Sequence, residues 1–226
     1  MTLEELEEIT LKIKNSSSEF DSQISICIGT ACLAVNSDKL KEAVEAEIAK
    51  CGLDRCKVRG VGCKGLCSAG PLVSIEPKDD IFKELTVEDA PALIEAAFGK
   101  EVLVSKKLDQ NESFFAKQTK IVLENAGFID PEKIEEYIAR RGYEALLTAL
   151  TQMTTSGVID EVRTSGLRGR GGGGYPTGLK WQTVAKSIGE QKYVVCNADE
   201  GDPGAFMDRS VLEADPHRVL EGMAIA

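Results

Sequence analysis

The sequence is poor in histidine, because His217 is the only one among 226 residues. It follows Asp215 and Pro216, a pattern typical of the first turn of a helix, so we expect His217 to pack or to cap that helix rather than to catalyse. This scarcity disfavours cysteine–histidine proteases and metal enzymes with histidine ligands.

Two further features are absent. No apolar run approaches the roughly 20 residues of a membrane-spanning helix, and the acidic first eight residues are unlike the positively charged start of a signal peptide. We therefore expect a cytoplasmic protein without direct membrane insertion, free to sit at the periphery of a membrane complex. A net charge of −10 leaves no excess of Lys and Arg for phosphate contacts, which argues against a nucleic acid partner.

The first half of the chain has the pattern of a small α/β layer. Thr2 and Glu5 have capping-box spacing, which predicts a helix to about Asn15, followed by a polar loop over residues 15–19. Apolar periodicity and glycine or proline boundaries then predict the order strand, helix, strand, hairpin, helix, which suits a thioredoxin-like domain. We expect strands at 23–27, 57–62, 71–76 and 81–85, a helix at 38–50 that Ser37 caps and Gly52 ends, and a helix at 86–99.

The pattern of the second half predicts a separate unit. Asp130 and Pro131 indicate the start of a helix whose apolar face carries Ile134, Tyr137 and Ile138. The last residues form an apolar, helix-like stretch, so we expect the chain to be a fragment of a longer protein. Further helices are expected at 143–152 and 179–188, and a buried strand at 192–196. The predicted organisation is an N-terminal helix (1–17), a thioredoxin-like domain (18–100), a linker (101–115) and an incomplete α/β domain (116–226).

Two close pairs of cysteines follow predicted strands, Cys27 with Cys32 and Cys63 with Cys67. In a compartment that keeps thiols reduced, clustered cysteines bind metals more often than they form disulfides. Their spacing differs from the two-residue gap usual in structural zinc sites and from that of plant-type ferredoxins. We interpret them as ligands of an iron–sulfur cluster, with zinc or free thiols as the alternatives.

The segments Cys27-Ile-Gly-Thr-Ala-Cys32 and Cys63-Lys-Gly-Leu-Cys67 resemble the thioredoxin-like 2Fe–2S domain of complex I and of NAD-linked hydrogenases. The resemblance implies one 2Fe–2S cluster bound by these four cysteines. Cys51 and Cys56 fall outside the pattern, and we expect them to pack or to remain unused.

A glycine-rich string is the second unusual feature, with seven glycines between Gly166 and Gly178. In regular structure each glycine costs about 0.5–1 kcal/mol relative to alanine. A flexible linker is the alternative interpretation, but linkers rarely carry Leu, Arg, Tyr and Pro among their glycines. We infer a backbone that lies flat against a ligand. Its match to the dinucleotide pattern is weak, because a predicted helix, not a strand, precedes it.

The string 167–181, taken with residues 196–209 (Cys-Asn-Ala-Asp-Glu-Gly-Asp-Pro-Gly-Ala-Phe-Met-Asp-Arg), closely resembles one family of flavin subunits. That family comprises the NADH-oxidising subunit of complex I and the flavin subunits of NAD(P)-linked hydrogenases and formate dehydrogenases. The resemblance implies the first part of an α/β FMN- and NADH-binding domain, with FMN and NAD(H) or NADP(H) as cofactors. The 4Fe–4S cluster of full-length relatives is expected only in a later segment.

The resemblance also implies a set of cofactor-binding residues. The glycine loop would line the flavin and nicotinamide pocket, Lys180 would lie near the isoalloxazine ring, and Tyr175 would stack on the nicotinamide nucleotide. No side chain is expected to act as a catalyst, because the cofactors do the bond making. The implied residues are Gly169, Arg170, Gly171, Gly172, Gly173, Gly174, Tyr175, Lys180, Asn197, Asp199, Glu200 and Asp202.

These features predict an NAD(P)H-oxidising or NAD(P)-reducing subunit that passes hydride between nicotinamide and FMN and single electrons to iron–sulfur clusters. Its expected partners are other iron–sulfur and catalytic subunits of a complex I-like, hydrogenase or formate dehydrogenase assembly. Two alternatives stay open. One is a non-enzymatic 2Fe–2S carrier with an inert flavin part, and the other is an interaction module whose cysteines hold zinc.

Overall fold

A four-stranded sheet organises the first half of the chain in the computed structural model, which describes residues 2–226. The strand order is β2-β1-β3-β4. The central strand β1 pairs in parallel with β2 and antiparallel with β3, and β3 forms a hairpin with β4. The four predicted strands, in the predicted order along the chain and with the predicted hairpin, are therefore confirmed. Their bounds are β1 (Ser22–Cys27), β2 (Cys56–Val61), β3 (Val73–Glu76) and β4 (Asp80–Phe82).

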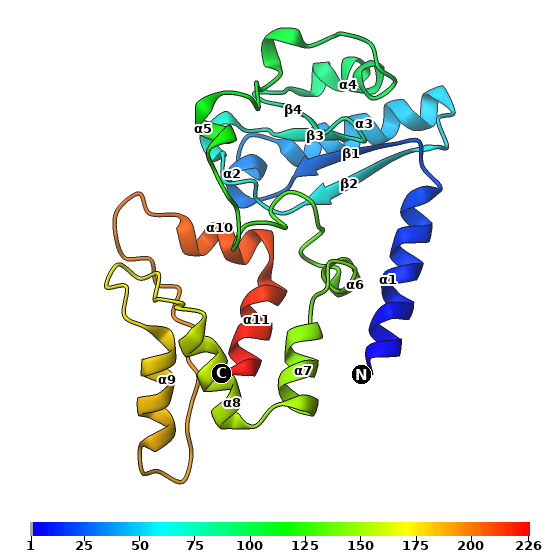
Figure 1. The fold of residues 1–226 in the computed structure, drawn as a ribbon. Helices are drawn as coiled ribbons and strands as arrows, with labels where there is room; N and C mark the ends of the chain where they lie inside the picture. Colours follow the sequence, from blue (N-terminus) through cyan, green and yellow to red (C-terminus); the bar gives the residue numbers. More distant parts are fainter. Residues whose placement is uncertain (1) are drawn as a thin grey trace.

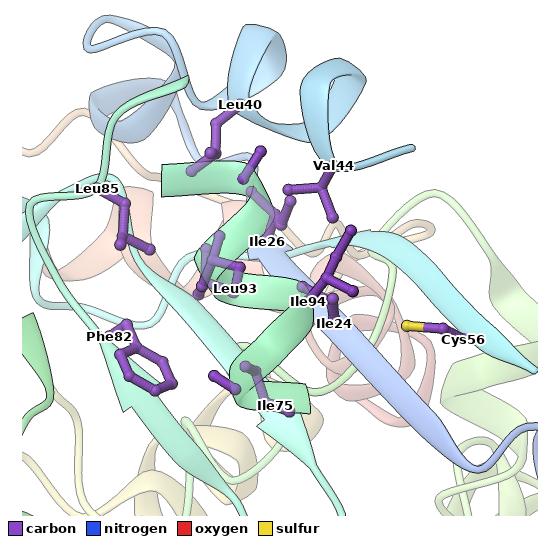
Figure 2. Packing of buried hydrophobic residues seen from close by; sticks show 13 residues of the cluster. Ile24, Ile26, Leu40, Val44, Cys56, Ile75, Phe82, Leu85, Leu93 and Ile94 are labelled. Atoms are coloured by element: carbon purple, nitrogen blue, oxygen red, sulfur yellow. The ribbon is translucent and has the colours of Figure 1, made fainter. Parts of the chain in front are cut away.

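Helices α3 (Ser37–Cys51) and α4 (Ala90–Ala97) contribute, with the sheet, to one hydrophobic core. Figure 2 shows Leu40 and Val44 of α3 meeting Leu93 of α4 above the strands. Fully burying one such side chain contributes about 1.5–3 kcal/mol, so this layer carries most of the apolar stabilisation of the domain. The buried members of the core are Ile24, Ile26, Leu40, Val44, Cys56, Val73, Ile75, Phe82, Leu85, Ala90, Leu93, Ile94 and Ala96.

A charged network ties the sheet to the second half of the chain. Arg59 of β2 donates to the hydroxyl of Ser25 on β1 at 2.9 Å. Its guanidinium also pairs with Glu76 at 3.0 Å and with Glu136, on α6 (Ile134–Ile138), at 3.4 Å. Because the Arg59 side chain is only 13% exposed, its charge needs these partners, and the contact fixes α6 against the sheet.

Some of the predicted helix caps are present in the structure and others are not. Thr2 and Glu5 form the predicted capping box at the start of α1 (Leu3–Ser18). That helix extends to Ser18, so the prediction of a loop from residue 15 was wrong for residues 15–18. The prediction that Ser37 caps α3 was also wrong, because Ser37 is the first helical residue and Asn36 is the N-cap. Gly52 ends α3 in the left-handed conformation, φ 64°, as predicted.

The second half is a set of short helices that extends away from the sheet (Figure 1). The predicted strand at 192–196 was wrong: these residues have no regular structure, and Cys196 is exposed. A strand requires a hydrogen-bonded neighbour, and no strand of residues 2–226 pairs with this segment. The helices are α5 (Ser113–Ala116), α6, α7 (Glu144–Gln152), α8 (Thr155–Thr164), α9 (Thr177–Lys186), α10 (Met207–Ala214) and α11 (Pro216–Ile225).

Helix α11, near the end of the chain, packs against α7. The buried carboxylate of Glu221 accepts hydrogen bonds from the Tyr137 hydroxyl and from the backbone N–H groups of Tyr143 and Leu146. His217 bonds to the Tyr143 hydroxyl at 2.9 Å and stacks on Tyr137, so its predicted packing role is confirmed. Along residues 2–226, no helix combines the length and the apolar character that crossing a membrane would require.

Candidate metal centre

The four paired cysteines meet at one edge of the sheet. Cys27 ends β1 and Cys63 follows β2, and parallel neighbouring strands bring their carboxyl ends to the same edge. The Cys27 thiol lies close to those of Cys32, on α2 (Thr30–Leu33), and of Cys63. Cys67, at the start of the 3-10 helix η1 (Cys67–Ala69), lies with its sulfur 3.7 Å from that of Cys63. The folded chain therefore joins loops that are some thirty residues apart in sequence.

The spacing and surroundings of these sulfurs fit a metal centre. Two ligands held about 2.3 Å from one tetrahedral metal lie about 3.8 Å apart, close to the 3.7 Å between Cys63 and Cys67. The backbone N–H of Gly65 donates to the Cys63 sulfur at 3.3 Å, a contact that favours a negatively charged sulfur. A Cβ at Gly70 would lie 2.9 Å from the Cys32 sulfur, so glycine keeps this wall of the site open.

Across residues 2–226, no three Cys, His, Asp or Glu side chains converge on a single ion position. A structural zinc requires four ligands around one point, whereas a two-iron cluster takes its thiolates as pairs, two for each iron. The distance between the Cys63 and Cys67 sulfurs is compatible with one such pair.

Close approach of the thiols changes their proton affinities. The hydrogen bond with Cys32 raises the pKa of Cys27 to about 11, and the same bond lowers the pKa of Cys32. The contact with Cys27 raises the pKa of Cys63, and burial raises that of Cys67. Because thiolates are the metal-binding form, loading the site must displace these protons.

Helix α10, from the glycine-rich half of the chain, lies against both cysteine loops. Arg209 points a guanidinium nitrogen at the Cys67 sulfur at 3.8 Å, and Glu213 accepts a hydrogen bond from the backbone N–H of Thr30 at 3.1 Å. The sequence gives no sign of either contact, since Arg209 and Cys67 are 142 residues apart. The i, i+4 spacing of Arg209 and Glu213 indicates only their mutual ion pair.

Lys64 is a second residue that sequence reasoning missed. Its side chain is buried and lies over the Phe128 ring, with the ammonium 4.9 Å from the ring centroid. Burial lowers the pKa of Lys64 to about 8. A Cβ at Gly127 would lie 2.2 Å from the Lys64 side chain, so this glycine makes room for the buried lysine beside Cys63.

The proposed flavin-binding residues do not converge on one position as the four cysteines do. The glycine string forms a loop between α8 and α9, closed by hydrogen bonds from Gly169 N–H to Tyr175 and from Thr177 N–H to Leu167, both 2.9 Å. Its tip, residues 171–173, has open space around each α-carbon. Asn197, Asp199 and Asp202 lie exposed on the following extended segment. A cavity of about 840 Å³ lies elsewhere, between residues of α6, α7 and α11.

The fold and the four converging thiols are those predicted for a thioredoxin-like domain, which is joined to a second segment of distinct composition. Residues 15–97 match the family model described as thioredoxin-like [2Fe-2S] ferredoxin. Residues 162–226 match the model described as Nuo51 FMN-binding domain. The chain is therefore similar to the first family over one segment and to the second family over a later segment.

Curated relatives carry names from oxidoreductase complexes. The chain is 62% identical over 109 residues to the NADP-reducing hydrogenase subunit HndC of Solidesulfovibrio fructosivorans. The matched residues make up 48% of this chain and 22% of the relative. The chain is 46% identical over 106 residues to an NADH-quinone oxidoreductase subunit of Rhizobium meliloti, covering 47% of this chain and 25% of the relative. Its matches therefore span about a quarter or less of these relatives.

One solved structure is similar to part of the chain. The thioredoxin-like [2Fe-2S] ferredoxin of Aquifex aeolicus is 20% identical, with a TM-score of 0.37, and covers 40% of this chain and 98% of its own.

Proposed function

We propose that the chain belongs to a flavin/iron–sulfur oxidoreductase subunit that exchanges electrons between NAD(P)H and the iron–sulfur centres of partner subunits. The FMN would take up hydride, and the clusters would carry single electrons. The observation that supports this most is the contact between the two family segments: Arg209 and Glu213 of the FMN-family segment reach the cysteine loops of the ferredoxin domain. The relatives named above are subunits of such oxidoreductases.

The roles proposed for individual residues follow from the two resemblances. Cys27, Cys32, Cys63 and Cys67 would ligate the 2Fe–2S cluster. The glycine loop would offer backbone N–H groups to the flavin, and the Lys180 ammonium would stabilise negative charge on the reduced ring. The remaining contacts with FMN and the nicotinamide nucleotide would come from Arg170, Tyr175, Asn197, Asp199, Glu200 and Asp202.

The domain boundaries and location are also part of this proposal. The proposed organisation is an N-terminal segment at 1–17, a ferredoxin domain at 18–100, a linker at 101–115 and a flavin-domain segment at 116–226, whereas helix α1 itself runs over Leu3–Ser18 in the structure. All seven cysteines are free thiols, which supports the proposed cytoplasmic location.

A second candidate is a 2Fe–2S electron carrier whose flavin segment is inert. It is favoured by the exposure of the glycine loop and of Asn197, Asp199 and Asp202. Under this hypothesis, the ferredoxin domain works alone and the rest of the chain serves to attach it to partners.

Loading the full chain anaerobically with iron, sulfide and FMN separates these candidates. The flavin-subunit hypothesis predicts about two irons and two acid-labile sulfides per chain, FMN retained after gel filtration, and bleaching of the cluster absorbance by NADH or NADPH.

Each other outcome supports a different candidate. An intact cluster spectrum with all FMN lost on gel filtration would favour the carrier. Metal analysis that returns zinc, without labile sulfide, would contradict both electron-transfer hypotheses and support the interaction module.

A further inference from the structure

Helix α10 bridges the two cysteine loops from one side. The Glu213 carboxylate bonds to the N–H and the hydroxyl of Thr30, in the loop between Cys27 and Cys32. One turn earlier, Arg209 reaches Cys67 in the other loop. Because residues four apart share a helix face, a single face of α10 contacts both halves of the cysteine site.

The Arg209 side chain is held in place by Glu213. Its Nε atom lies 3.8 Å from a Glu213 carboxylate oxygen, and its Nη2 atom lies 3.8 Å from the Cys67 sulfur. The Glu213 side chain is 20% exposed and the Arg209 side chain 42% exposed, so Glu213 is shielded from water more than Arg209 is. Shielding strengthens the effect of a charge on a neighbouring group.

The backbone of Arg209 is anchored to the proposed flavin site. The Glu200 carboxylate accepts hydrogen bonds from the N–H groups of Asp208 at 2.7 Å and of Arg209 at 3.2 Å. A carboxylate at the start of a helix satisfies N–H groups that lack partners within the helix. Glu200 thereby fixes the first turn of α10, and with it the base of the Arg209 side chain.

We propose that Arg209 is a redox-tuning residue: from the FMN-family segment, it raises the reduction potential of the cluster bound by the ferredoxin domain. This inference rests on the proposed function, since it requires the 2Fe–2S cluster. Reduction adds one electron and therefore one negative charge. A hydrogen bond and a positive charge at a ligand sulfur stabilise that charge. Glu213 partly neutralises the positive charge of Arg209 and should therefore lower the reduction potential of the cluster.

The test is a redox titration of the reconstituted full chain with dithionite as the one-electron reductant, followed by electron paramagnetic resonance. The variants are Arg209→Gln and Glu213→Gln. The control is Arg55→Gln, which removes an exposed arginine paired with Asp21 at the opposite end of β2, roughly 20 Å of extended chain from the cysteine loop.

We expect Arg209→Gln to shift the midpoint potential to more negative values, Glu213→Gln to shift it to more positive values, and the control to leave it unchanged. The g-values should stay those of the unmodified cluster in all three. A purely structural role for the pair does not predict shifts of opposite sign.

Two results would overturn the inference while leaving the proposed function intact. One is a loaded Arg209→Gln chain with the unmodified potential. The other is a Glu213→Gln chain whose potential is unchanged or lower, which decides the matter even if the Arg209 variant fails to load. Failure of the unmodified chain to assemble any 2Fe–2S cluster would instead remove the proposed function, and the inference with it.

Discussion

A Cys67→Ala chain is expected to retain no 2Fe–2S cluster after anaerobic reconstitution. Removing one thiolate leaves one iron with an open position, because such a cluster takes four cysteine ligands. Alanine offers no oxygen or nitrogen that could replace the sulfur. The measurement is iron and acid-labile sulfide per chain, together with the visible absorbance of the cluster.

Cys67 is the best of the four positions for this test. It is half-buried, whereas Cys27, Cys32 and Cys63 are buried, so alanine at this position disturbs packing least. Far-ultraviolet circular dichroism of the metal-free variant should therefore match that of the metal-free unmodified chain. The loaded unmodified chain should melt at a higher temperature than both, because the free energy of metal binding adds to that of folding.

Cys51→Ala is the matched control. Cys51 is exposed at the end of α3 and outside the proposed ligand set. It should load as much iron and sulfide as the unmodified chain. Full loading of Cys67→Ala, or equal losses in the two variants, would rule out Cys67 as a specific ligand.

The ferredoxin domain could be predicted from sequence because its signals are local. The Thr2–Glu5 capping box, the terminal Gly52 and the alternating strands each require only neighbouring residues, and all appear in the structure. The meeting of the cysteine pairs also follows from local signals, since two parallel strands deliver both loops to one edge of the sheet.

Local sequence patterns gave wrong predictions where contacts with other segments of the chain determine the structure. The apolar run Tyr193–Val195 has the composition of a strand, but a strand forms only beside another strand, and these side chains are exposed. The serines after Asn15 suggested a loop, but the hydroxyls of Ser16 and Ser18 donate to carbonyls within the helix, that of Ser18 to Asn15 at 2.7 Å. Contacts such as Arg209 with Cys67 depend on tertiary docking, which no short pattern encodes.

The docking of α10 on the cysteine loops depends on Gly62, which precedes Cys63. A Cβ at Gly62 would lie 2.5 Å from the Ala214 α-carbon and 2.6 Å from the Glu213 carbonyl oxygen. Both are backbone atoms, so rotation of a side chain cannot relieve the clash. We expect Gly62→Ala to displace α10, at a cost of about 1–3 kcal/mol as for other overpacked sites. The amides of Met207–Ala214 should then exchange with deuterium faster.

Gly222→Ala makes the same chemical change in the neighbouring helix α11, where a Cβ meets nothing within 4 Å. It should leave exchange of the α10 amides unchanged and can only favour the helix, since alanine is preferred there by about 0.5–1 kcal/mol. Displacing α10 also removes Arg209 from Cys67, so the loaded Gly62→Ala chain should show the negative shift of potential expected for Arg209→Gln. Unchanged protection of α10 in Gly62→Ala would mean that the helix does not rest on this loop in solution, and the proposed contact between the two family segments would lose its basis.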